Sequence, residues 1–233
     1  MGEYGYFNRP VYDDDTQIRR TWDLENMRNV AHKFSLMLAN NDAAKALETC
    51  WVTDPKYTAD ASYGKNWGYY VGMDEVKRYF LDPARTEKFI DCMIPMTSWV
   101  IEQAHDDNTA QAVFYAIWYD VEKDGEGEDA HWYSAKIGVD FVKQDDGWKI
   151  WHYFMGVDLF CKAGEDFGDQ KSTICNDESI PNPLKADFGT PTIAMDAYST
   201  KYNWSHYPPL PTPHATYAET TNCGPTGNPN YKA

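Results

Sequence analysis

The stretch HWYSAKIGVDFVKQDDGWKIWHYFMGVD, residues 131–158, decides the fold of this chain. It reads as two strands joined by a tight polar turn at residues 144–147, because apolar and polar residues alternate on both sides of that turn. The preceding stretch MTSWVIEQAHDDNTAQAVFYAIWYDVE, residues 96–122, repeats the pattern with a turn at residues 105–108. The middle of the chain is therefore expected to be an antiparallel meander.

Helices are expected before the meander. A helix that begins at Thr21 carries one apolar stripe, formed by Leu24, Met27, Val30, Ala31, Phe34 and Leu38. Residues 42–51 read as a second, shorter helix, which Asp54-Pro55 ends. The segment GMDEVKRYFLDP, residues 72–83, reads as a third, with Gly72 before it and Asp82-Pro83 after it. Helices followed by antiparallel strands indicate an α+β fold.

Charge and composition limit the possible partners. The formal net charge is −15, from 21 basic and 36 acidic side chains, so we expect neither nucleic acid nor a membrane as a partner. The sequence shows no basic, apolar leader and no apolar run of about 18 residues. Its five cysteines are scattered, without a Cys-x-x-Cys pair. We therefore expect a cytoplasmic protein with no disulfide framework and no zinc site.

Composition divides the chain into three parts. Residues 1–16 are rich in Tyr and Asp and show no period, which is typical of an arm lying on a surface. Residues 17–160 hold the periodic segments and are expected to form one domain. Residues 161–233 are rich in Pro, Gly, Asn, Ser and Thr. Their many tyrosines predict an irregular C-terminal strap that packs on the domain or on a neighbouring subunit.

The order of these segments resembles the SnoaL-like branch of the nuclear transport factor 2 superfamily. The resemblance covers about residues 20–160. After the stripe helix, it rests on NNDAAKALETCWVTD (40–54), GMDEVKRYF (72–80), DDNTAQA (106–112) and VDFVKQDDGWKIWHY (139–153). It implies a cone, in which a strongly curved antiparallel sheet wraps around a long helix with an apolar pocket at the wide end. It also implies a homodimer or homotrimer.

The resemblance leaves the function open. Relatives include ketosteroid isomerase, scytalone dehydratase and bile acid 7α-dehydratase, alongside binding and assembly proteins, so the residues of the site must decide.

His152 is the first candidate for catalysis. Alternation places it on one strand face with Trp148, Ile150 and Phe154; this face lacks the charged Lys149 and is expected to face the interior. An imidazole among aromatic side chains can move a proton to or from a bound substrate. The alternative is a core histidine bonded to a backbone carbonyl.

His131 opens the preceding strand. It shares a face with an apolar series, Tyr133, Ala135, Ile137, Val139 and Phe141. This parity points His131 inward at the strand end, near the expected mouth of the pocket. Alternatively, it is a solvated loop residue after the acidic run at 124–129.

Asp60 follows Tyr57 in KYTAD. The resemblance to ketosteroid isomerase implies a proton-shuttling aspartate at a similar place, and a carboxylate in an apolar pocket has a raised pKa. The alternative is an aspartate that caps a turn.

Strand residues Tyr115, Tyr119 and Asp120 are further candidates. Tyr115 and Tyr119 share a strand face, and a buried phenol can donate a hydrogen bond to a developing enolate. The helix tyrosine of the isomerases falls near Phe34 here, which has no hydroxyl, so their oxyanion hole does not transfer. The expected pocket lining is Phe34, Leu38, Tyr133, Ile137, Ile150 and Phe154.

These candidates support one hypothesis and two alternatives. The hypothesis is a dehydratase that needs no cofactor or metal and acts on an apolar cyclic hydroxy-carbonyl compound. His152 and Asp60 would share general acid and base catalysis, Tyr57, Tyr115 or Tyr119 would polarise the carbonyl, and His131 would lie near the mouth. The alternatives are a double-bond isomerase and a non-catalytic binding or assembly module. No glycine-rich phosphate loop supports a nucleotide cofactor.

Overall fold

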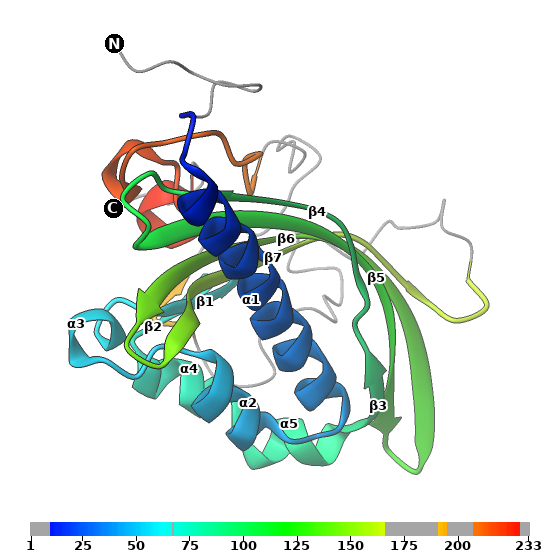
Figure 1. Ribbon diagram of the computed structural model, residues 1–233. Helices are drawn as coiled ribbons and strands as arrows, with labels where there is room; N and C mark the ends of the chain where they lie inside the picture. The colour runs from blue at the N-terminus through cyan, green and yellow to red at the C-terminus, as the bar shows by residue number, and fades with distance from the viewer. Residues whose placement is uncertain (1–9, 67, 166–190, 195–206, 229–233) are drawn as a thin grey trace.

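The computed structural model describes residues 10–66, 68–165, 191–194 and 207–228. A curved, unclosed eight-stranded sheet wraps around helix α1 (Asp14–Ala39), which lies on its concave face (Figure 1). The fold is therefore α+β, as the sequence predicts. None of the described helices is both long and apolar enough to span a membrane.

The other elements follow α1 in chain order. The helices are α2 (Ala43–Cys50), α3 (Pro55–Thr58), α4 (Met73–Phe80) and α5 (Pro83–Lys88), with the short 3₁₀ helices η4 (Tyr217–Glu219) and η5 (Pro225–Gly227). The strands are β1 (Ser62–Lys65), β2 (Gly68–Val71), β3 (Phe89–Met93), β4 (Met96–Gln103), β5 (Thr109–Asp124), β6 (Gly127–Gln144), β7 (Gly147–Lys162) and β8 (Ile193–Ala194). Their order in the sheet is β3-β5-β6-β7-β1-β2-β8, with β4 also paired to β5.

All pairings between the described strands are antiparallel except that of β1 with β7, and an isolated parallel bridge joins Trp51 to Ile150 of β7. Strand β1 pairs with β7 in parallel, with Ser62 opposite His152. The stretch KYTADASYG, residues 56–64, reads in the sequence as a strand running into a turn, but its first part is helical. Asp54 caps the N-terminus of α3 by accepting a hydrogen bond from the Lys56 amide at 2.8 Å. The Asp-Pro pair therefore starts a helical turn here, because proline suits the first helical position.

Helix α1 begins earlier than predicted. Its N-cap is Asp13, whose carboxylate accepts a hydrogen bond from the Thr16 amide at 2.8 Å, and acids at positions 14 and 15 lie in its first turn. Thr21 lies inside the helix, with its hydroxyl bonded to the Gln17 carbonyl at 2.9 Å. The acidic run supplies both the cap and the charge that favour a helix start. The first turn of α1 thus lies within residues 1–16, and residues 1–9 of the expected arm lie outside the described part.

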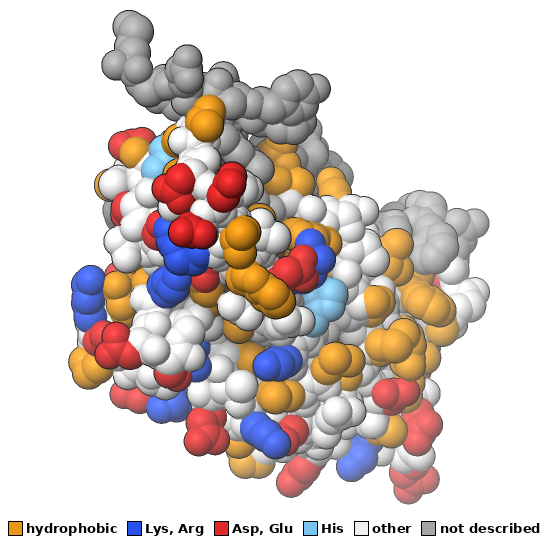
Figure 2. Space-filling model, in the orientation of Figure 1, with side chains coloured by type: hydrophobic (Ala, Val, Ile, Leu, Met, Phe, Trp, Pro, Cys, Tyr) orange, Lys and Arg blue, Asp and Glu red, His pale blue; other side chains and the backbone are white. Residues whose placement is uncertain are grey.

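Charged and hydrophobic side chains share the exposed side of the helices (Figure 2), where Ile18, Trp22 and Leu36 of α1 are 57 %, 67 % and 63 % exposed. Acidic and basic groups are interspersed on the face shown in Figure 2. Some pair one turn apart, as Glu25 does with Arg28 at 3.0 Å, and Glu75 with Arg78 at 2.5 Å.

One hydrophobic core fills the space between α1 and the sheet. Buried Met27, Ala31 and Phe34 of α1 belong to it. The inner face of β6 contributes the series predicted by alternation, Tyr133, Ala135, Ile137, Val139 and Phe141. The structure therefore confirms the inner face that alternation predicts for β6.

Strand β7 changes parity part-way along. Ile150 lies opposite Phe141 and His152 lies opposite Asp140, so Trp151 is an extra residue and forms a β-bulge. Trp148 and Ile150 belong to the main core before the bulge, and Tyr153, Met155 and Val157 belong to it after the bulge. The prediction that His152 and Phe154 face the interior is therefore wrong, because the extra residue turns them to the outer face.

Residues 207–228, here called the C-terminal segment, cover this outer face. Tyr69 and Phe154 pack with Tyr207 and Cys223 in a second, smaller cluster. Gly138 permits the contact, since a Cβ there would lie 2.5 Å from the Cβ of Pro208. The rest of the strap lies outside the described residues, apart from residues 161–165 and 191–194.

Candidate active site

His152 is buried under the C-terminal segment. Its Nδ1 lies 2.9 Å from Asp140 Oδ2 and 2.9 Å from the Tyr217 hydroxyl. Its Nε2 lies 3.1 Å from the Asp60 carbonyl oxygen. With only 5 % of the residue exposed, the ring is fully engaged on the side of the sheet away from α1. These contacts join the C-terminal segment to the sheet and place the imidazole outside the core.

Asp60 and Tyr57 lie beside the bulge. The exposed Asp60 carboxylate accepts a hydrogen bond from Trp151 Nε1 at 2.9 Å. The Tyr57 ring meets the Trp151 ring edge-on, with centroids 5.3 Å apart. Both therefore support the end of β7 where the bulge lies, and the expected apolar environment for Asp60 is absent because its side chain reaches solvent.

Tyr115 and Tyr119 face outward on β5. Tyr115 is 49 % exposed, and the Tyr119 hydroxyl bonds to the exposed Asp91 carboxylate at 3.3 Å. Their neighbours Ala116 and Trp118 lie in the core instead. The expectation of buried phenols is wrong here, because both faces of β5 carry apolar residues and composition alone did not reveal which face is inside.

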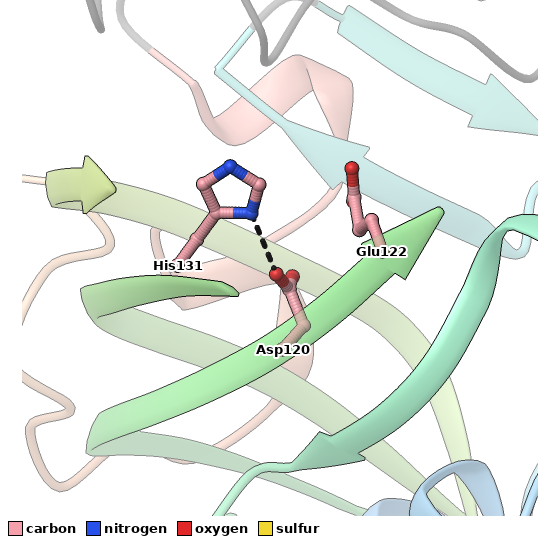
Figure 3. A group of neighbouring side chains, drawn as sticks. All are labelled: Asp120, Glu122 and His131. Atoms are coloured by element: carbon pink, nitrogen blue, oxygen red, sulfur yellow. Dashed lines mark hydrogen bonds and ion pairs between the residues drawn. The ribbon is translucent and has the colours of Figure 1, made fainter. Parts of the chain in front are cut away.

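His131 and Asp120 form a pair on the inner face of the sheet. They lie opposite each other on β6 and β5, and His131 Nδ1 is 3.1 Å from Asp120 Oδ1 (Figure 3). Their side chains are 11 % and 5 % exposed. His131 lies opposite Lys162 on β7, ten residues beyond His152, which is roughly 30 Å along the strand. The two histidines therefore belong to opposite ends and opposite faces of the sheet.

Glu122 joins this pair as a second carboxylate. It follows Asp120 by two residues on the same strand face (Figure 3). The Lys88 ammonium lies 3.1 Å from the Glu122 carboxylate. Burial raises the pKa of Glu122, Asp120 adds to the rise, and Lys88 opposes it. One atom from each of Glu122, Asp120 and His131 lies within 4.8 Å of the others. This donor set could hold a divalent cation, although each side chain already has a partner within the protein.

Aromatic rings flank the pair. Trp118 and Tyr133 stack with centroids 4.6 Å apart. Burial raises the pKa of Tyr133, and the nearby Asp120 and Glu122 charges together with a hydrogen bond to Asp120 raise it further. Tyr133 therefore keeps its proton and can serve as a donor beside the carboxylates.

Cations approach from α5 and β1. Burial would raise the pKa of Tyr79, but Lys65 and Arg85 overcome this effect and lower it below its ordinary value. Burial raises the pKa of Cys92 to about 12, Asp120 adds to the rise, and Arg85 and Lys65 oppose it. Cys92 lies opposite Asp120 in the sheet, so charges of both signs act on this end of the core.

The remaining predicted pocket residues lie in or against the core. Phe34 makes edge-on contacts with three rings, with centroids 5.5 Å from Tyr153, 5.6 Å from Phe80 and 5.8 Å from Trp51. Ile137 and Ile150 are buried with it, and Leu38 packs against the same cluster.

Sequence reasoning missed Glu122, Lys88 and Arg85 as parts of this site. Parity could have found Glu122, since it shares a strand face with Asp120. Lys88 and Arg85 come from the short helix α5, and no pattern in the sequence places that helix beside β5.

Comparison with known proteins identifies the fold family. A family model described as a SnoaL-like domain matches residues 19–153, which is more than half of the chain. The chain belongs to the SnoaL-like family. A search against curated proteins found no match. This family membership confirms the resemblance seen in the sequence.

Solved structures agree with this assignment at low sequence identity. Hexachlorocyclohexane dehydrochlorinase LinA-type3 from Novosphingobium barchaimii superposes with a TM-score of 0.51 and 12 % identity, over 66 % of this chain and 97 % of that one. A protein assigned as a scytalone dehydratase from Novosphingobium aromaticivorans gives 0.51 and 12 %, over 74 % and 98 %. At such identities these likenesses establish the fold alone.

Proposed function

We propose that this SnoaL-like protein is a cofactor-independent dehydratase acting on a cyclic hydroxy-carbonyl compound, with His131 as the general base. The single observation that carries the proposal is the buried His131–Asp120 pair on the inner face of the sheet. A histidine oriented by a carboxylate is a recurrent arrangement for proton transfer. The proposal moves the chemistry from His152 and Asp60 to the other end of the sheet.

Asp120 would set the tautomer of His131. A proton on Nδ1 satisfies the 3.1 Å contact with the carboxylate, which leaves Nε2 as the basic nitrogen. Nε2 would take the proton from a carbon next to the substrate carbonyl. The Asp120 charge would then stabilise the imidazolium formed in that step.

Glu122 would supply the proton for the departing hydroxyl. Burial raises its pKa, which keeps a protonated fraction at higher pH than for an exposed glutamate. The electron pair of the broken C–H bond would form the new double bond, and hydroxide would leave as water with the Glu122 proton. Return of the first proton from His131 to a different carbon, without loss of hydroxide, would make the protein an isomerase instead.

The test is turnover of a panel of cyclic hydroxy-ketones, followed by mass for the loss of water. Replacing the base, in His131→Asn, is expected to lower the rate about 10²- to 10⁴-fold without unfolding the protein. His105→Asn makes the same change at the turn before β5 and should leave the rate unchanged. The proposal fails if no compound loses water, or if His131→Asn keeps the wild-type rate. Runs with a chelator test whether a cation at Asp120, Glu122 and His131 takes part, in which case the chelator lowers the rate.

A further inference from the structure

Arg85 differs from the other arginines that the structure describes. Arg19 and Arg20 contact Asp107, Arg28 contacts Glu25, and Arg78 contacts Glu75. The Arg85 guanidinium has no hydrogen bond or ion pair to any described residue, and its Nε is buried without an acceptor. A buried N–H group that lacks an acceptor costs free energy, so an acceptor from outside the protein would be favoured there.

Aromatic rings hold Arg85 in place. Its guanidinium carbon lies 5.1 Å from the ring centre of Phe89, 5.2 Å from that of Phe80 and 5.8 Å from that of Tyr79. Such cation–π contacts orient the planar group while leaving its N–H edge available. The positive charge also affects its neighbours: with Lys65, Arg85 lowers the pKa of Tyr79 against the effect of burial, and it opposes the rise that burial causes in the pKa of Cys92.

Arg85 lies at the end of the sheet that carries the His131 pair. Phe89, on which it packs, is opposite Glu122 in the β3–β5 ladder. Cys92, whose thiol is affected by the Arg85 charge, is opposite Asp120. The cation and the proton-handling residues therefore approach the same end of the core from two sides.

We propose that Arg85 binds a planar oxyanion carried by the cyclic ligand of this site, either a carboxylate or the enolate oxygen formed during the reaction. The guanidinium fork matches such oxygens through parallel N–H bonds, and the aromatic rings beside it suit a flat ring. A protein of net charge −15 repels anions over most of its surface, which makes this cation selective. The identity of the ligand as a substrate rests on the proposed function, but the binding itself does not.

The experiment measures equilibrium binding of three aromatic probes by the whole protein. They are 2-naphthoate, 4-nitrophenolate at pH 8.5, and the neutral ketone 2-acetylnaphthalene. Wild type is expected to bind at least one anion about tenfold tighter than the ketone, and Arg85→Gln should lose that preference. Tighter naphthoate identifies a carboxylate, whereas tighter nitrophenolate identifies an enolate-like oxygen.

Arg78→Gln is the matched control, since it removes an exposed arginine paired with Glu75 on the neighbouring helix. It should bind like wild type. If Arg85→Gln does not fold, Arg85→Lys replaces it and should bind the preferred anion about tenfold more weakly, because an ammonium lacks the fork. Equal binding of anions and ketone by wild type, or unchanged preference in the Arg85 variant, overturns the proposal. His131→Asn should keep the preference, so failure of the proposed dehydratase would leave this result intact.

Discussion

Two histidines of this protein each lie within hydrogen-bonding distance of an aspartate carboxylate, but they occupy different faces of the sheet. His131 lies 3.1 Å from Asp120, and His152 lies 2.9 Å from Asp140. The first pair is on the inner face, beside Glu122 and the aromatic rings. The second is on the outer face, where the C-terminal segment adds its own donors. A carboxylate beside a histidine therefore does not identify an active site until the strand face is known.

The carboxylate of Asp140, beside His152 on the outer face, accepts several hydrogen bonds. It is fully buried and accepts hydrogen bonds from the Cys223 amide at 2.7 Å, the Tyr217 hydroxyl at 3.0 Å and the Gln111 amide at 3.1 Å. Asp140→Asn would replace one carboxylate oxygen with an NH₂ group, which cannot accept these hydrogen bonds, and would remove the negative charge. We expect the free energy of unfolding in urea to fall by about 3 kcal/mol.

Asp60→Asn is the control for this change. Its carboxylate is exposed and accepts one bond, so its loss should cost no more than about 1 kcal/mol. Equal effects of the two substitutions would contradict a structural role for the Asp140 contacts.

Glu122 gives a pH-dependent prediction. Burial and Asp120 raise its pKa above the ordinary 4.5, against the opposing effect of Lys88. An acid with a raised pKa in the folded chain opposes folding once it ionises. The penalty is therefore absent below pH 4.5 and complete above the folded-state pKa. Glu122→Gln should raise the free energy of unfolding at pH 8, by up to about 1 kcal/mol, and leave it unchanged at pH 4.

Glu75 provides a control of opposite sign. Its bond to Arg78 lowers its pKa, so its ionised form favours folding above pH 4.5. Glu75→Gln should slightly lower stability at pH 8 and lower it less at pH 4, because the contribution of an acid with a lowered pKa fades below pH 4.5 and disappears only below its folded-state pKa. Urea unfolding curves at both pH values measure the four differences, and a stabilising Glu75→Gln would contradict the argument.

At the level of elements, strand β7 marks the limit of sequence reasoning. Alternation predicts the correct inner face for β6, including His131, because β6 keeps its two-residue period from His131 to Phe141. The same rule failed after Trp151, since a bulge changes parity without changing composition. The prediction that Tyr115 is buried fails for another reason: apolar residues occur on both faces of β5, so alternation does not identify the inner one. No sequence pattern could place Arg85 and Lys88 of α5 beside this site, because their positions depend on how α5 packs against the sheet.

The contact between β6 and the C-terminal segment depends on one glycine. A Cβ on residue 138 would lie 2.5 Å from Pro208 and 2.6 Å from the sulfur of Cys223. Gly138→Ala should displace the segment and make residues 207–228 sensitive to limited proteolysis. Gly156→Ala on β7 is the control, since its nearest neighbours are 3.3 Å or more away. Similar cleavage of both variants would show that the segment does not depend on this close approach.

On the scale of the whole molecule, the sheet has a different cover on each face. Helix α1 covers the inner face and the C-terminal segment covers part of the outer one. The resemblance to the SnoaL-like family implies the first arrangement, in which the sheet wraps around the stripe helix. The sequence predicts a strap packed on the domain or on a neighbouring subunit, but not where it lies. A segment without a hydrophobic period gives no information about which surface it covers. The homodimer or homotrimer stays a prediction.

Removal of the C-terminal segment should uncover apolar surface. Tyr69 and Phe154 have no exposed surface in the intact protein. A chain ending at residue 206 is expected to bind a hydrophobic fluorescent dye more strongly and to unfold at lower urea concentration than a chain ending at residue 228. The His131–Asp120 pair lies on the other face, so turnover by any surviving folded molecules should persist. Unchanged dye binding would contradict the covering role.

Trp151 is the extra residue that decides which face of the sheet each following residue of β7 points to. Deleting that one codon would exchange the two sides of the strand downstream, so that Phe154 would turn toward α1 and Tyr153 away from it. Amino-acid replacements in this strand alter one contact each, whereas a change of length alters all of them together. Homologous sequences should therefore place their gaps at the turns near residues 105–108 and 144–147 and leave the spacing between Trp148 and Val157 intact.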